Sequence, residues 1–162
     1  MNKIISFLSL LIVVAFSSCS GSDPETEKKL EGTWESVEYE NEDGMKMKIT
    51  SLETYSLSDH VYHSTVKMEM LSPVYVNMGT VSYSGSWSAS KDMVTCKIDK
   101  NSVSFNFSNM LDSDEKRELK QDFLSSLKEQ NYEEGMHITS SITDSFTASD
   151  DEGESFTYTR VK

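Results

Sequence analysis

Residues 80–89, Thr80-Val81-Ser82-Tyr83-Ser84-Gly85-Ser86-Trp87-Ser88-Ala89, alternate between two kinds of side chain. The even positions hold hydroxyl side chains, whereas the odd positions hold apolar side chains and one glycine. A period of two is typical of a β-strand with one buried face and one solvated face. This stretch therefore predicts a half-buried strand, which we expect to extend over 74–89.

Shorter segments on both sides of this strand alternate in the same way and are separated by turn sequences such as Asn41-Glu42-Asp43-Gly44. The connections are too short for helical crossovers, which favours an antiparallel meander. Ser and Thr make up about a quarter of the chain, and such side chains tolerate a solvated strand face. The further strands are expected at 30–40, 45–57, 62–70, 94–98, 103–107, 136–148 and 156–161.

One segment, residues 112–130, breaks the strand pattern because it is rich in Glu, Lys, Leu and Gln and lacks Gly and Pro. Asp112 followed by Glu115 predicts a capping box at its start. We therefore expect one amphipathic helix, which covers either an open mouth of the β-structure or the outside of the sheet. Its apolar stripe consists of Leu119, Phe123 and Leu127.

The size and charge of the chain restrict the function. The 162 residues suit one domain, and a 10% share of aromatic residues is enough for a packed core. The formal net charge of −12 excludes nucleic acid as a partner, because a phosphate backbone needs a basic surface.

The amino-terminal residues have the pattern of a signal peptide. Lys3 precedes an apolar run over 4–16, which is too short to span a membrane. The sequence Phe16-Ser17-Ser18-Cys19 then resembles the lipobox of bacterial lipoproteins. That resemblance implies removal of residues 1–18 and lipid attachment at Cys19, in the outer membrane of the cell envelope.

A polar stretch over 19–29 is expected to be a flexible tether, followed by one domain over 30–162. Within the tether, residues 22–25 loosely resemble the acidic export signal of surface lipoproteins, so the periplasmic face and the cell surface both remain open. Once Cys19 is lipidated, only Cys96 remains, which excludes an intramolecular disulfide.

Gly32-Thr33-Trp34 opens the expected domain and resembles the first-strand motif of lipocalins. In that family an Arg from a late strand packs over the Trp, and Arg160 is the candidate here. Residues 83–87 and 94–96 resemble the middle of small lipocalin-like lipoprotein domains of Bacteroides and its relatives. The resemblance implies a small antiparallel β-barrel, although strands follow the helix here, whereas lipocalins place a helix after the eighth strand.

Motifs for catalysis and metal binding are missing from the sequence. It contains no glycine-rich phosphate loop and no paired-cysteine motif, and His60 and His63 point to opposite faces of a strand. We therefore expect no enzyme, no metal site and no cofactor. The methionines are expected to line an adaptable apolar pocket or the core. They are Met45, Met47, Met68, Met70, Met78 and Met93.

Two functions follow from these expectations. The first is a membrane-anchored barrel that binds a small apolar or amphipathic ligand. The second is a structural or interaction protein of the envelope, with the barrel filled by its own side chains and with another envelope protein as partner. A ligand cavity typically has a volume of ~300–1,000 Å³, so the cavity volume decides between them. The candidate ligand-lining residues are Tyr83, Trp87, Phe105, Phe123 and Phe146.

Overall fold

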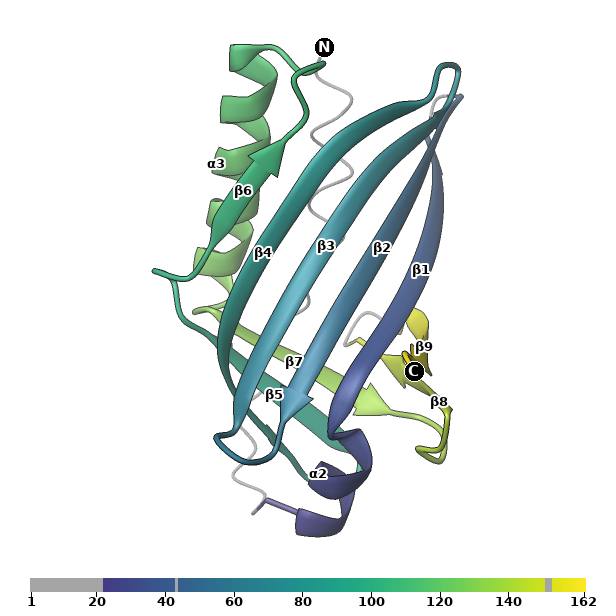
Figure 1. Ribbon diagram of the computed structural model, residues 1–162, viewed down its shortest axis with the longest axis vertical. Coiled ribbons are helices and arrows are strands. Elements are labelled where there is room, and N and C mark those ends of the chain that lie inside the picture. Colours follow the sequence, from purple (N-terminus) through teal and green to yellow (C-terminus); the bar gives the residue numbers. More distant parts are fainter. Residues whose placement is uncertain (1–21, 43, 151–152) are drawn as a thin grey trace.

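The protein is an antiparallel β-barrel, seen in a computed structural model that describes residues 22–42, 44–150 and 153–162 (Figure 1). Eight strands close the barrel, because β3 pairs with β4 as well as with β2. This confirms the predicted mainly β, lipocalin-like fold. The strands are β1 (Gly32–Glu42), β2 (Met45–Ser56), β3 (Val61–Ser72), β4 (Val76–Ala89), β5 (Met93–Ile98), β7 (Glu133–Ile138), β8 (Ser145–Ser149) and β9 (Ser155–Arg160).

The strand predicted from residues 74–89 is β4, and two different strands pair with the same edge of it. Its second half pairs with β5, whereas Gly79–Ser82 pair with the short strand β6 (Ser104–Phe107). Its apolar odd positions face the core, where Val81 and Trp87 are buried. The alternation in the sequence therefore reports the inner and outer faces of the barrel.

Helix α3 (Ser113–Glu129) lies beside β6 on the flank of the barrel (Figure 1). The predicted capping box is present, because Asp112 Oδ1 accepts from Glu115 N and Asp112 N donates to Glu115 Oε2. The stripe of Leu119, Phe123 and Leu127 is buried. Phe123 contacts Tyr83 on β4 and Phe105 on β6. This face of the helix therefore packs against the part of the barrel wall in which β4 pairs with β6 and not with β5.

The single strand predicted over 136–148 is instead two strands, β7 and β8, with a loop between them. Hydroxyl groups in the loop compete with strand pairing. Ser140 Oγ accepts from Thr147 N at 2.8 Å, and Thr139 N donates to Thr147 O at 2.9 Å. These bonds turn the chain back on itself, and Ile142 leaves the strand pattern.

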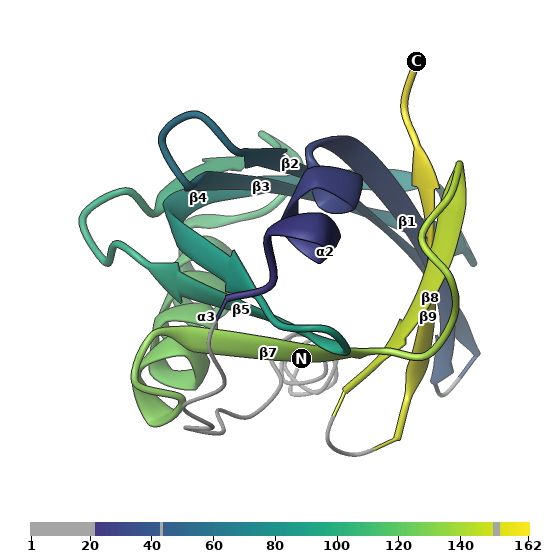
Figure 2. The ribbon, with the colours of Figure 1, turned by 90° about the horizontal axis from the view of Figure 1, so that it is seen from below.

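The flexible tether predicted over 19–29 is also corrected, because Pro24–Leu30 form helix α2. Asp23 caps this helix by accepting from Glu25 N and from Thr26 Oγ1, and Pro24 occupies the first turn. The helix lies across one end of the barrel (Figure 2). We call this the closed end.

Candidate ligand-binding site

The closed end joins the first and last strands around Trp34, which is fully buried. The Arg160 guanidinium carbon lies 4.1 Å from the centroid of the Trp34 ring. The same guanidinium donates to the carbonyl oxygens of Lys29 and Glu31 at 2.6 Å each, so it also caps the C-terminus of α2. Gly32 has a φ of +121°, which favours glycine, and a Cβ there would also lie 2.6 Å from Arg160 Nη1.

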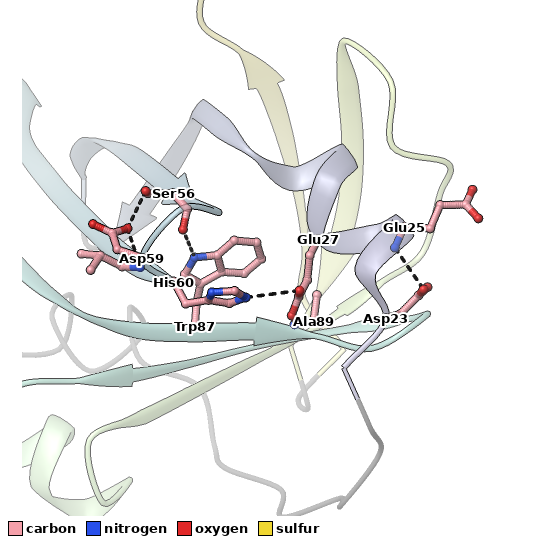
Figure 3. Close-up of polar contacts among 9 residues, drawn as sticks. Asp23, Glu25, Glu27, Ser56, Asp59, His60, Trp87 and Ala89 are labelled. Atoms are coloured by element: carbon pink, nitrogen blue, oxygen red, sulfur yellow. Dashed lines mark hydrogen bonds and ion pairs between the residues drawn. The ribbon is translucent and has the colours of Figure 1, made fainter.

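Helix α2 docks through a buried carboxylate, Glu27. Its Oε1 accepts from Ala89 N at 3.3 Å, and its Oε2 lies 3.4 Å from His60 Nε2 (Figure 3). Trp87 lies beside His60 and donates from Nε1 to Ser56 O at 3.0 Å. The polar groups of the closed end therefore have protein partners.

The middle of the barrel holds carboxylates that face inward among tyrosines. Glu53 on β2 is only 7% exposed and accepts from Tyr55 Oη at 2.7 Å. Glu134 on β7 accepts from Tyr83 Oη at 3.1 Å. Among the described residues, the Lys and Arg side chains that form ion pairs do so with other carboxylates, so neither Glu53 nor Glu134 has a cationic partner there.

The interior raises the proton affinity of these carboxyls. Burial raises the pKa of Glu53 to about 7. Burial, and then the charge of Glu53, raise the pKa of Glu134 to about 8. Burial and the neighbouring Glu40 raise the pKa of Glu38 to about 7. A bound cation would supply the opposite charge that these groups lack.

Glu38, Glu53 and Glu134 line a cavity of about 70 Å³, which we call the carboxylate cavity. Part of its wall is β7, through Glu134, Gly135 and Met136. β7 pairs with β8 only at His137↔Ser149 and Ile138↔Ala148, and we call this weakly paired line the seam of the barrel. The first half of β7 pairs with β5 on one side, and no described strand pairs with its other side. Apolar side chains complete the wall, namely Val66, Met136 and Phe156.

Of the predicted ligand-lining residues, only Tyr83 lines this cavity. Trp87 packs against Tyr55 at the closed end, and Phe146 packs against Trp34. Phe105 and Phe123 contact each other at the junction of β6 and α3. These four aromatic side chains fill the core and the flank, so they do not line the carboxylate cavity.

Sequence reasoning missed Glu53 and Glu134. A signal for Glu53 exists, because it shares the alternating face of 45–57 with Met47, Ile49 and Tyr55, and a carboxylate on an apolar strand face is unusual. Glu134 follows the turn after α3, in a stretch without alternation, so the sequence carries no comparable signal for it.

The predicted signal peptide and Cys19 lie outside the described residues. No helix of the described part of the chain combines the length and the apolar character needed to cross a membrane. Within the same part, no group of three His, Cys, Asp or Glu side chains is placed to hold a metal ion.

Comparisons with known proteins add no family assignment, because no protein-family model and no curated protein matches the chain.

Proposed function

We propose that this protein is a lipid-anchored protein of the bacterial cell envelope whose barrel binds a small amphipathic ligand, without catalysing a reaction on it. The carboxylates that line the cavity carry this proposal, since the cavity volume taken alone favours a filled barrel. Glu53 and Glu134 suit a ligand with a positively charged group, since each carboxylate accepts a charge-assisted hydrogen bond. Met136 on β7 and Phe156 on β9 suit the start of an apolar remainder of the ligand, where it leaves the cavity.

The volume of about 70 Å³ restricts how such a ligand is held. It is below the ~300–1,000 Å³ of typical drug-sized sites, so the cavity takes the charged head group only. The apolar part of the ligand would then lie along the seam between β7 and the β8–β9 hairpin.

Three six-carbon probes test this proposal, because hexylamine, hexanol and hexanoate differ only in the head group. We expect calorimetry with the full chain to show binding of hexylamine at pH 8 and none of hexanoate. Equal or tighter binding of hexanol or hexanoate, or no binding of hexylamine, would contradict a cation-selective site.

A pair of neighbouring residues provides the matched control. Glu134→Gln removes the inward charge and is expected to weaken hexylamine binding about tenfold or more, since a hydrogen bond to a charged group contributes ~1.5–3 kcal/mol. Glu133→Gln changes the adjacent residue, which pairs with Lys97 outside the barrel, and should leave binding unchanged.

The anchor is tested separately at Cys19. Cys19→Ala is expected to abolish incorporation of labelled fatty acid and to leave an uncleaved precursor or a protein lost from the membrane fraction. Equal labelling of the variant and the wild type would contradict lipid attachment at this residue.

The second candidate is an interaction protein with a filled barrel, and the small cavity volume favours it. Exposed apolar side chains on the outer face of β1 and β2, namely Val37, Tyr39 and Leu52, would then contact an envelope partner. A photo-crosslinking amino acid at Tyr39 should capture one defined envelope protein, and the same label at Glu118 on α3 should not.

A further inference from the structure

A second cavity, of about 160 Å³, lies at the far end of the barrel, opposite α2. Five of its eight lining residues are methionines, out of nine in the whole chain. We call it the methionine cavity. The five are Met45, Met47, Met70, Met78 and Met110.

Strand register brings the first three together. Met45 and Met47 are two residues apart on β2 and therefore share one face of the strand. Met70 on β3 lies directly opposite Met47. Opposite residues of an antiparallel pair have Cβ atoms ~4.5–5.5 Å apart, so these two thioethers meet at the same wall of the cavity.

A β-bulge adds Met78. The pairing of β3 with β4 passes from Met68↔Gly79 to Glu69↔Asn77, which leaves Met78 as the extra residue. Asn77 Oδ1 accepts from Gly79 N at 3.0 Å, and Gly79 has a φ of +125° that favours glycine. The bulge turns Met78 inward, where it is buried.

The donor atoms of this cavity are soft. Thioether sulfur binds Cu(I) and other soft ions, whereas zinc, calcium and magnesium sites use nitrogen, thiolate or oxygen ligands. Among the described residues, Glu115 is the one carboxylate of the lining, and its Oε2 already accepts from Asp112 N. The lining of the cavity therefore offers several neutral sulfur ligands on flexible side chains.

We propose that the methionine cavity binds one Cu(I) ion through Met47, Met70 and Met78. Met110, which is 70% exposed in the turn before α3, also lines the cavity. The net charge of −12 favours the approach of a cation. This site is independent of the carboxylate cavity, since the two cavities have no lining residue in common.

The test uses Ag(I), a soft monovalent ion that stands in for Cu(I) without redox chemistry. The full chain is labelled with carbon-13 at the methionine methyl groups and titrated with Ag(I) in an NMR experiment. At one equivalent, the signals of Met47, Met70 and Met78 should shift, and those of Met93 and Met136 should not. Unchanged signals for the first three would overturn the proposal.

A triple variant separates sulfur coordination from apolar packing. Met47→Leu, Met70→Leu and Met78→Leu together keep the volume and the apolar lining, so the fold and its melting temperature should be retained. Ag(I) binding should be lost, whereas Met93→Leu should leave it intact. Retained Ag(I) binding in the folded triple variant would refute the site.

Thiols also bind soft ions, so the titration is repeated with Cys96→Ala and with Cys19→Ala. The methionine shifts are expected to persist in both variants. Loss of the shifts in either one would assign the ion to a cysteine and overturn the proposal.

Discussion

The closed end and the carboxylate cavity differ in the partners of their charged side chains. At the closed end, the charge of Arg160 meets two backbone carbonyl oxygens and the face of Trp34. In the carboxylate cavity, Glu53 and Glu134 receive hydrogen bonds from tyrosines but no ion pair from a described Lys or Arg.

We therefore expect the residues of the closed end to stabilise the fold and the carboxylates of the cavity to destabilise it when they are ionised. A buried charge without a cationic partner is unfavourable, and a fold retains such groups where they serve binding. Substitutions at the closed end should therefore destabilise the barrel, whereas neutralising a carboxylate of the cavity should stabilise it at high pH.

The largest effect is expected at Trp34. Trp34→Ala removes a fully buried ring that packs edge-on against Phe146 at 4.9 Å and donates to Leu30 O. The free energy of unfolding should fall by ~3–5 kcal/mol, measured by urea denaturation. An unchanged denaturation midpoint would remove this ring from the stabilising core.

The second largest effect is expected for Phe123→Ala, which should lower the free energy of unfolding by an amount near the lower end of the same ~3–5 kcal/mol range. Phe123 is buried between Tyr83 and Phe105 but does not line the carboxylate cavity. Its loss should therefore lower stability and leave the affinity for hexylamine nearly unchanged. Lost binding at unchanged stability would instead make α3 a lid over the ligand.

The pH dependence of stability should differ between the wild type and Glu53→Gln. In the folded state the pKa of Glu53 is about 7, against an ordinary value of about 4.3 in the unfolded chain. Between these values the folded state holds a proton that the unfolded state has released. The contribution of Glu53 to stability therefore falls as the pH rises from about 4.3 to about 7.

Glu53→Gln should remove this decline, so its advantage over the wild type should grow from pH 5 to pH 8 by up to a few kcal/mol. Urea denaturation across this range measures it. Glu69→Gln is the control of opposite sign, because the hydrogen bond from Lys67 lowers the pKa of Glu69. This variant should lose stability at pH 8, and equal pH profiles for all three proteins would contradict the assignment.

The smallest effect is expected for Arg160→Gln, which should lower the free energy of unfolding by ~1–2 kcal/mol. The change removes the cation above Trp34 and weakens the two bonds to the end of α2. Arg117→Gln is the matched control, since Arg117 forms only an exposed ion pair with Asp114 on α3. Thermal denaturation should separate the two variants.

The sequence predicted the parts of the fold in which local pattern and tertiary packing agree. The alternation over 80–89 marks β4, and Asp112 with Glu115 marks the start of α3. The lipocalin resemblance led to Gly32, Trp34 and Arg160, which the structure brings together at the closed end.

The sequence failed where a tertiary contact decides the local structure. Residues 24–30 are mostly polar and show no apolar stripe, so α2 was not predicted. The helix is fixed by its Asp23 cap and by the docking of Glu27 against Ala89, which lies 62 residues away. Glu134 enters the carboxylate cavity only because β7 pairs with β5, a neighbour that the sequence pattern does not reveal.

The extent of strand pairing varies around the barrel, and it is small at the seam between β7 and β8. Eleven residue pairs join β1 to β2, whereas two join β7 to β8. Local opening should therefore begin at this seam, and the amide proton of Thr139, which donates to Thr147 O on β8, should exchange with solvent faster than those of β2. Opening of the wall along this line would admit a ligand sideways to Glu134, while α2 stays across the closed end.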